Sequence, residues 1–149
     1  MHDLFLHDAD ATAALGAGLA ANLPEHAVVD LHGDLGAGKS TLARALLRAL
    51  GVTGTIRSPT YTLVEQYPLP VGGMALHLDL YRIGAPGELE FLGLDAGDIR
   101  LWLVEWPERG QGALPHPDLR IELEVESTGR RCRLRPASPV GEAWVAALA

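Results

Sequence analysis

Residues 33–40 read GDLGAGKS and match the phosphate-binding pattern G-x-x-x-x-G-K-[ST] at every position. The preceding stretch 27–32, AVVDLH, is apolar and predicts a buried strand. The following stretch 39–50 predicts a helix, because its apolar residues recur on one face. A strand, a glycine-rich loop and a helix in this order restrict the chain to α/β folds in which the helix packs on a sheet.

The residue types of this loop indicate its chemistry. Glycines let backbone N–H groups turn inward around a phosphate, at a helix N-terminus that already favours anions. Lys39 would reach the β- and γ-phosphates, and the Ser40 hydroxyl is a hard oxygen ligand for Mg²⁺. The loop therefore predicts a site for a nucleoside triphosphate and magnesium.

Further strands and helices are expected on both sides of the loop. Apolar patterns predict strands at 4–7, 62–67, 74–80 and 100–105 and helices at 12–22 and about 87–91. Asp10 is the expected cap of the first helix.

The C-terminal part alternates between apolar and charged residues, in LRIELEVE at 119–126 and RRCRLR at 130–135. Pairing glutamates with arginines predicts a β-hairpin with a four-residue loop at 127–130. The expected pairs are Glu126 with Arg131, Glu124 with Arg133 and Glu122 with Arg135. Arg130 falls outside this ladder and is free for another role. The whole chain, 1–149, is expected to be a single domain with a P-loop NTPase-like α/β fold. That fold would have a mixed central β-sheet flanked by helices, with a C-terminal β-hairpin.

Two apolar strands end in an acid, Asp79 after LHL and Glu105 after LWLV. A P-loop site needs further groups to hold the magnesium and the attacking water. The C-terminal strand ends of an open α/β sheet line the ligand crevice, so both acids could face the phosphates. Position alone leaves open which acid binds the metal and which positions the water.

Two other residues near these motifs have a functional and a structural interpretation. Thr60, in the loop SPTY, could sense a γ-phosphate through its hydroxyl, or belong to an ordinary turn. His77, two residues before Asp79, is interpreted as a packed strand residue.

Charge and composition limit the classes of partner. The formal net charge is −7, and the only dense basic run is 130–135, so tight unaided binding to DNA or RNA is not expected. No apolar stretch approaches the roughly 20 residues that cross a bilayer. The first ten residues lack the features of a signal peptide, and the single cysteine, Cys132, fits a reducing compartment. We therefore expect a cytoplasmic protein with no membrane partner.

Missing motifs narrow the class of nucleotide protein. No guanine-reading N-K-x-D follows the P-loop, and no D-x-x-G stands between the loop and Glu105, which disfavours a standard GTPase. The arginine-rich lid and acceptor pocket of a small-molecule kinase are not recognisable. A kinase of this kind, or a nucleotide-binding module with little turnover, remains the alternative to an ATPase.

Taken in order, GDLGAGKST, SPTYTLVE, HLDLYR, ELEFLGLD and LVEWPERG resemble the TsaE (YjeE) family. The resemblance covers nearly the whole chain. It implies an ATPase required for the threonylcarbamoyl modification of adenosine 37 in tRNAs that read ANN codons. It also implies the partner proteins TsaB and TsaD, with tRNA met only through that complex.

The resemblance further implies roles for individual residues. ATP and Mg²⁺ would be the cofactors, with Ser40 and Glu105 as the metal ligands. Asp79 would support hydrolysis, and Thr60 would lie in a switch-like loop. The nucleotide would be bound by Thr12, Gly36, Ala37, Gly38, Lys39, Ser40, Thr41 and Arg130.

Overall fold

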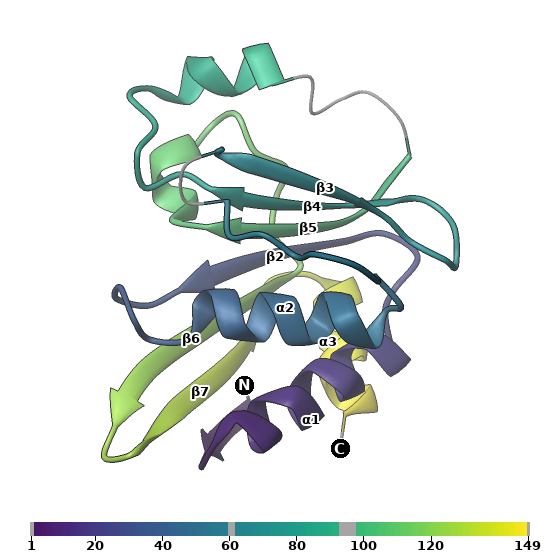
Figure 1. Ribbon diagram of the computed structural model, residues 1–149, viewed down its shortest axis with the longest axis vertical. Coiled ribbons are helices and arrows are strands. Elements are labelled where there is room, and N and C mark those ends of the chain that lie inside the picture. The colour runs from purple at the N-terminus through teal and green to yellow at the C-terminus, as the bar shows by residue number, and fades with distance from the viewer. Residues whose placement is uncertain (1, 60–61, 93–97, 149) are drawn as a thin grey trace.

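A computed structural model describes residues 2–59, 62–92 and 98–148. Within these residues, seven strands form one mixed sheet in the order β1-β7-β6-β2-β5-β4-β3 (Figure 1). The strands are β1 (His2–Leu6), β2 (Ala27–His32), β3 (Val64–Pro68), β4 (Met74–Asp79), β5 (Ile99–Glu105), β6 (Leu119–Glu126) and β7 (Gly129–Pro136).

The centre of the sheet is parallel. β2 pairs in parallel with β5 and β6, and β5 pairs in parallel with β4. The outer pairs β1–β7, β6–β7 and β3–β4 are antiparallel. The carboxyl ends of β2, β4, β5 and β6 therefore meet at one edge, the edge where open α/β sheets bind ligands. The predicted mixed sheet is confirmed.

The described residues include three α-helices, α1 (Ala9–Ala21), α2 (Lys39–Ala49) and α3 (Pro139–Ala147), and two 3₁₀ segments, η1 (Pro86–Leu92) and η2 (Pro107–Gly110). Helices α1 and α2 lie side by side on one face of the sheet (Figure 1). α2 begins directly after the P-loop and buries Leu42, Leu46 and Leu47. In the described part of the chain, no helix has the length and apolar character needed to cross a membrane.

Alternation along the strands assigns each residue to one face of the sheet. Val29 and Leu31 of β2 and Leu101 and Leu103 of β5 point toward α2 and form one apolar cluster with the helix leucines. On the opposite face, β4 and β5 contribute to a second cluster with residues from the following segments. Its buried members are Leu76, Leu78, Leu80, Ile83, Leu89 and Val104.

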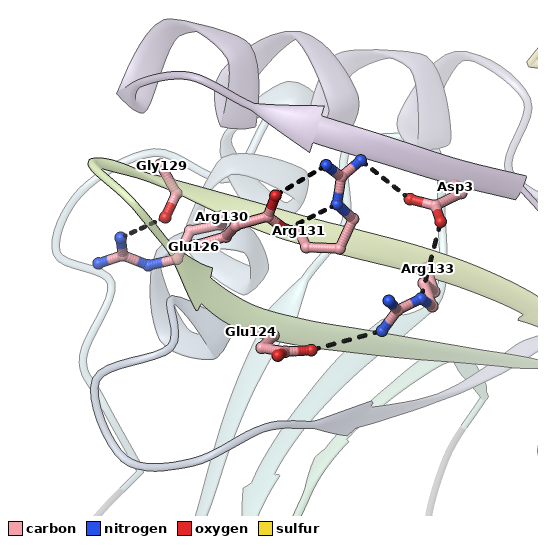
Figure 2. A network of polar contacts seen from close by, with 7 residues as sticks. All are labelled: Asp3, Glu124, Glu126, Gly129, Arg130, Arg131 and Arg133. Carbon is pink, nitrogen blue, oxygen red and sulfur yellow. Dashed lines mark hydrogen bonds and ion pairs between the residues drawn. The ribbon is translucent and has the colours of Figure 1, made fainter.

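The C-terminal hairpin is confirmed, but its predicted register is wrong. Glu126 lies opposite Gly129, so a two-residue turn at 127–128 replaces the predicted four-residue loop. The predicted ion pairs nevertheless form on the diagonal, at 2.9 Å for Arg131–Glu126, 3.4 Å for Arg133–Glu124 and 2.9 Å for Arg135–Glu122. Figure 2 shows the first two pairs, together with Asp3 of β1, which contacts both arginines. Long side chains reach diagonal neighbours, so the charges indicated the correct partners but not the correct opposing residues.

The cap of the first helix differs from the expectation. Asp8, not Asp10, caps α1, because its side chain accepts a hydrogen bond from Ala11 N at 2.9 Å.

Helix α3 was not predicted. It follows Ser138, whose hydroxyl accepts from Gly141 N at 3.1 Å. Its Trp144 indole donates to the Leu19 carbonyl of α1 at 3.1 Å.

Candidate functional site

Side chains alternate between the two faces along each strand, and this alternation places polar side chains beside the P-loop, at the carboxyl edge of the sheet. On β5, Glu105 continues the alternation of Leu101 and Leu103, which face α2. On β4, Asp79 has the same parity as Ala75, another residue of that cluster. The strand order places β4 and β5 side by side, with Asp79 directly opposite Glu105. The two acids therefore lie next to each other beside the start of α2.

The P-loop has the backbone conformation that its glycines allow. Gly36 and Gly38 have φ angles of +82° and +106°, a region that side chains with a Cβ rarely adopt. Gly38 immediately precedes α2, so backbone N–H groups at the helix start are available to an anion.

Lys39 is folded into this loop. Its ammonium donates a hydrogen bond to the Gly33 carbonyl and lies 4.0 Å from the ring centroid of Trp106. Burial lowers the pKa of Lys39, while the neighbouring carboxylates of Glu105 and Asp79 act in the opposite direction. The ammonium is thus a buried cation between two acids and an aromatic ring, a position from which it could neutralise phosphate charge.

Glu105 is the centre of a buried polar chain. The Ser40 hydroxyl donates to its carboxylate at 3.2 Å from Oε2 and 3.4 Å from Oε1. On the other side, His77 Nε2 lies 2.6 Å from Glu105 Oε2. Asp79 differs, since its Oδ1 accepts from the backbone N–H of Tyr81 at 3.0 Å.

The donor atoms at Ser40 and Glu105 suit a hard divalent cation. A hydroxyl and a carboxylate within hydrogen-bond distance of each other are oxygen ligands of the kind that Mg²⁺ takes beside substrate phosphates. Among the residues that the structure describes, no cluster of three or more His, Cys, Asp or Glu side chains is arranged to hold a metal by itself. A cation here would thus take its remaining ligands from phosphate and water.

Two adjoining cavities meet at the P-loop and share Gly38, Thr41 and Arg130 in their walls. The first, of about 280 Å³, is lined by the P-loop with Asp79, Glu105 and Trp106. The second, of about 220 Å³, is lined by the start of α1, including Thr12, and by the turn of the hairpin. Together they form a cleft from the acids to the start of α1.

Arg130 lies where the two cavities adjoin and lines both of them. It has the strand parity of Cys132 and Leu134, so its side chain lies on the α2 face. Its guanidinium donates to the carbonyls of Gly129 at 2.9 Å and Gly36 at 3.4 Å. Figure 2 shows Arg130 pointing away from Arg131 and the ion pairs of the opposite face. Arg130 is therefore outside the Glu–Arg ladder as predicted, but because of its parity and not because it lies in a loop.

The structure brings together the predicted site residues that it describes, since each one lines at least one of the two cavities. They are Thr12, Gly36, Ala37, Gly38, Lys39, Ser40, Thr41, Asp79, Glu105 and Arg130. Thr60 lies outside the described residues. The sequence interpretation missed the contacts of His77 and Trp106. The parity shared by His77 and Asp79 could have indicated that the histidine faces the same site.

Sequence comparisons with known proteins agree on one family. The family model of Threonylcarbamoyl adenosine biosynthesis protein TsaE matches residues 6–133. A protein of Haemophilus influenzae named tRNA threonylcarbamoyladenosine biosynthesis protein TsaE is 42% identical over 122 residues, which cover 80% of this chain and 77% of that one. A relative of the same name from Streptomyces coelicolor is 37% identical over 138 residues, covering 89% and 93%. The crystal structure of Bacillus subtilis YdiB has a similar fold, with a TM-score of 0.75 at 24% identity, covering 99% of this chain and 93% of that one.

Proposed function

The chain belongs to the TsaE family of threonylcarbamoyl adenosine biosynthesis proteins, and we propose that it serves this tRNA modification as a magnesium-dependent ATPase. The observation that carries the proposal is the contact of Ser40 with Glu105 at 3.2 Å beside the P-loop lysine. A hydroxyl, a carboxylate and a cation at one helix start match the demands of a bound nucleoside triphosphate and its metal. We further propose that the fold is of the P-loop NTPase type.

The side chains of the site have different roles in ATP binding and in hydrolysis. Ser40 and Glu105 would hold Mg²⁺, which would supply positive charge beside the phosphates. Lys39 exchanges its contacts with Gly33 and Trp106 for the β- and γ-phosphates. Asp79 orients the attacking water, whose oxygen forms a bond to the γ-phosphorus while the bond from that phosphorus to the β–γ bridging oxygen breaks. The products are ADP, phosphate and the proton that the water gives up.

The second cavity accommodates the remaining part of ATP. Thr12 lies in its wall, and its hydroxyl donates to the Asp8 carbonyl at 3.4 Å. This position places the hydroxyl beside the space that the nucleotide would fill. Arg130 stands between the cavities and reaches the outer phosphates or the sugar. For Thr60, which lies outside the described residues, we propose that its hydroxyl senses the γ-phosphate.

The partners follow from the family. We propose that TsaB and TsaD associate with this chain, and that the modified nucleotide is adenosine 37 of tRNAs reading ANN codons. Hydrolysis of ATP by this chain drives a step of the complex, while the transfer to tRNA belongs to the partners.

The proposal is tested by measuring ATP affinity by calorimetry and phosphate release, first for this chain alone and then with TsaB, TsaD and tRNA. Lys39→Ala is expected to weaken ATP binding at least 10-fold, because a cation at the phosphates is lost. Partner proteins are expected to stimulate phosphate release. Unchanged affinity in Lys39→Ala would contradict the P-loop assignment.

The same assays distinguish the roles of the two acids, Glu105 and Asp79. Glu105→Ala should raise the magnesium concentration needed for ATP binding, since a metal ligand acts in the ground state. Asp79→Asn should keep this affinity and lose turnover, since a water-orienting group acts mainly in the transition state. The opposite pattern would show that their roles are exchanged.

A further inference from the structure

His77 is the one histidine of β4, and its side chain is almost completely buried beside the proposed metal ligand. The side chains of His77 and Glu105 are 2% and 3% exposed, and Nε2 lies 2.6 Å from Glu105 Oε2. A contact this short between two buried polar groups requires a shared proton, because two unprotonated acceptors would repel each other.

The surroundings of the other ring nitrogen determine which tautomer is present. His77 Nδ1 is buried and has no hydrogen-bond partner among the described residues. A proton on Nδ1 would be a buried donor left unsatisfied, which is unfavourable because the N–H loses its hydrogen bond to water and gains none in return. The favoured form therefore carries its hydrogen on Nε2 and donates it to Glu105.

We infer that His77 is a positioning residue that holds the Glu105 carboxylate in the orientation needed to bind the metal. The inference rests on the proposed function. Ser40 approaches both carboxylate oxygens, at 3.2 and 3.4 Å, while His77 approaches Oε2. Each carboxylate oxygen has two lone-pair sites, so these bonds fix the plane of the group and leave Oε1 able to accept a cation.

Strand geometry explains why a histidine serves here. His77 lies opposite Leu103 in the parallel β4–β5 pair, two residues before the Asp79–Glu105 pair. Its Nε2 reaches the carboxylate of the diagonal residue on the neighbouring strand, and His77 is not among the residues that line the two cavities. Hydrogen bonds to metal-ligating carboxylates fix their orientation, and their loss typically weakens metal affinity 10- to 100-fold.

The test uses two amide variants of the full chain that differ by one methylene. His77→Gln can carry an N–H to the place of Nε2, whereas His77→Asn is too short to reach it. The measured quantity is the Mg²⁺ concentration that gives half-maximal ATP binding, with ATP affinity in EDTA as the reference. We expect His77→Asn to raise that concentration about 10-fold or more and His77→Gln to stay within a few-fold of the unmodified chain.

A purely structural role would not give this pattern, because a general loss of packing would also lower ATP affinity in EDTA. The inference is overturned if His77→Asn keeps the normal magnesium requirement, or if the two variants are equally impaired with metal-free affinity intact. His77→Leu, which fills the space without a donor, should behave like His77→Asn. An unmodified chain that fails to bind ATP at all would refute the proposed function itself, which distinguishes the two failures.

Discussion

Asp30 is a buried carboxyl group without a hydrogen bond or ion pair to any residue that the structure describes. It lies on β2 and faces away from α2, in the wall of a cavity of about 510 Å³ that also involves Glu108, His116 and Arg120. Burial raises the pKa of Asp30 from 3.8 to about 6; the charge of Glu108 adds to this effect, while Arg120 and His116 oppose it. The ionised carboxylate therefore destabilises the folded chain at neutral pH.

The sign of this effect gives a prediction for stability. A raised folded-state pKa means that the native protein holds the Asp30 proton over the interval from 3.8 to about 6, where the unfolded chain has lost it. The destabilisation grows with pH across this interval and is constant above it. Asp30→Asn should increase the free energy of unfolding by up to about 3 kcal/mol above the interval and have little effect below it.

Urea unfolding at several pH values measures this difference. Glu124→Gln is a suitable control, because the Glu124 side chain is largely exposed and its ion pair with Arg133, at 3.4 Å, is at the surface. That substitution should change stability by no more than about 1 kcal/mol at any pH. A constant gain from Asp30→Asn across the whole range would refute the titration argument.

At the scale of elements, the packing of α2 against α1 fixes the position of the P-loop, which leads directly into α2. A Cβ on Gly16 of α1 would come within 2.8 Å of Ala45 Cβ and 2.9 Å of the Leu46 nitrogen. Only a residue without a side chain lets the helices approach so closely. Because α2 starts at the proposed phosphate site, this approach also supports the position of Lys39.

Gly16→Ala is therefore expected to destabilise the protein by about 1–3 kcal/mol, even though alanine favours helix formation, because the α2 backbone cannot yield as a side chain can. Gly18→Ala, on the same helix, is the matched control. Its Cβ would meet Leu148 Cδ2, at 3.3 Å, which is the end of a flexible side chain. Urea midpoints of the two variants check the prediction, and equal midpoints would contradict it.

The hairpin presents its arginines to opposite faces of the sheet. Arg130→Ala should weaken ATP binding about 10-fold, because a cation beside both cavities is removed. Arg133→Ala should leave ATP affinity unchanged, since that side chain contacts Asp3 and Glu124 on the far face. Calorimetric titration of both variants with ATP in magnesium makes the comparison. Equal losses would show that the face assignment does not govern nucleotide binding.

At the scale of the whole molecule, the net charge bears on the proposal that the chain encounters tRNA only through partner proteins. The net charge is −7, and the arginines of the dense basic run at 131, 133 and 135 are paired with acids across the hairpin. The hairpin therefore offers little uncompensated positive charge to a phosphate backbone. This supports an encounter with tRNA through partner proteins.

The chain alone is expected to retain little tRNA in a filter-binding assay at physiological salt, and retention should appear when the TsaB–TsaD complex is added. Lowering the salt should not restore strong binding to the chain alone, because few phosphate contacts are available to form. Tight binding by the isolated chain with a steep salt dependence would contradict the proposed route.

Features set by near neighbours in the chain could be predicted from the sequence. The P-loop octet, the strand before it and the helix after it depend on local backbone preferences and on a regular apolar pattern. The face of Arg131, Arg133 and Arg135 follows in the same way from alternation, as does their attraction to the glutamates of the neighbouring strand. Even so, charge alone did not determine which residues lie directly opposite each other in the hairpin, because long side chains also reach diagonal partners.

Only the tertiary structure decided which strands are neighbours. β5 lies between β2 and β4 although it follows both in the chain, and this order sets Glu105 beside Asp79 and within reach of Ser40, 65 residues away. The contact of His77 with Glu105 has the same origin. An apolar strand can pair with many other strands. Which of them become its neighbours depends on how both faces of the complete sheet are buried, and a local sequence pattern does not specify this.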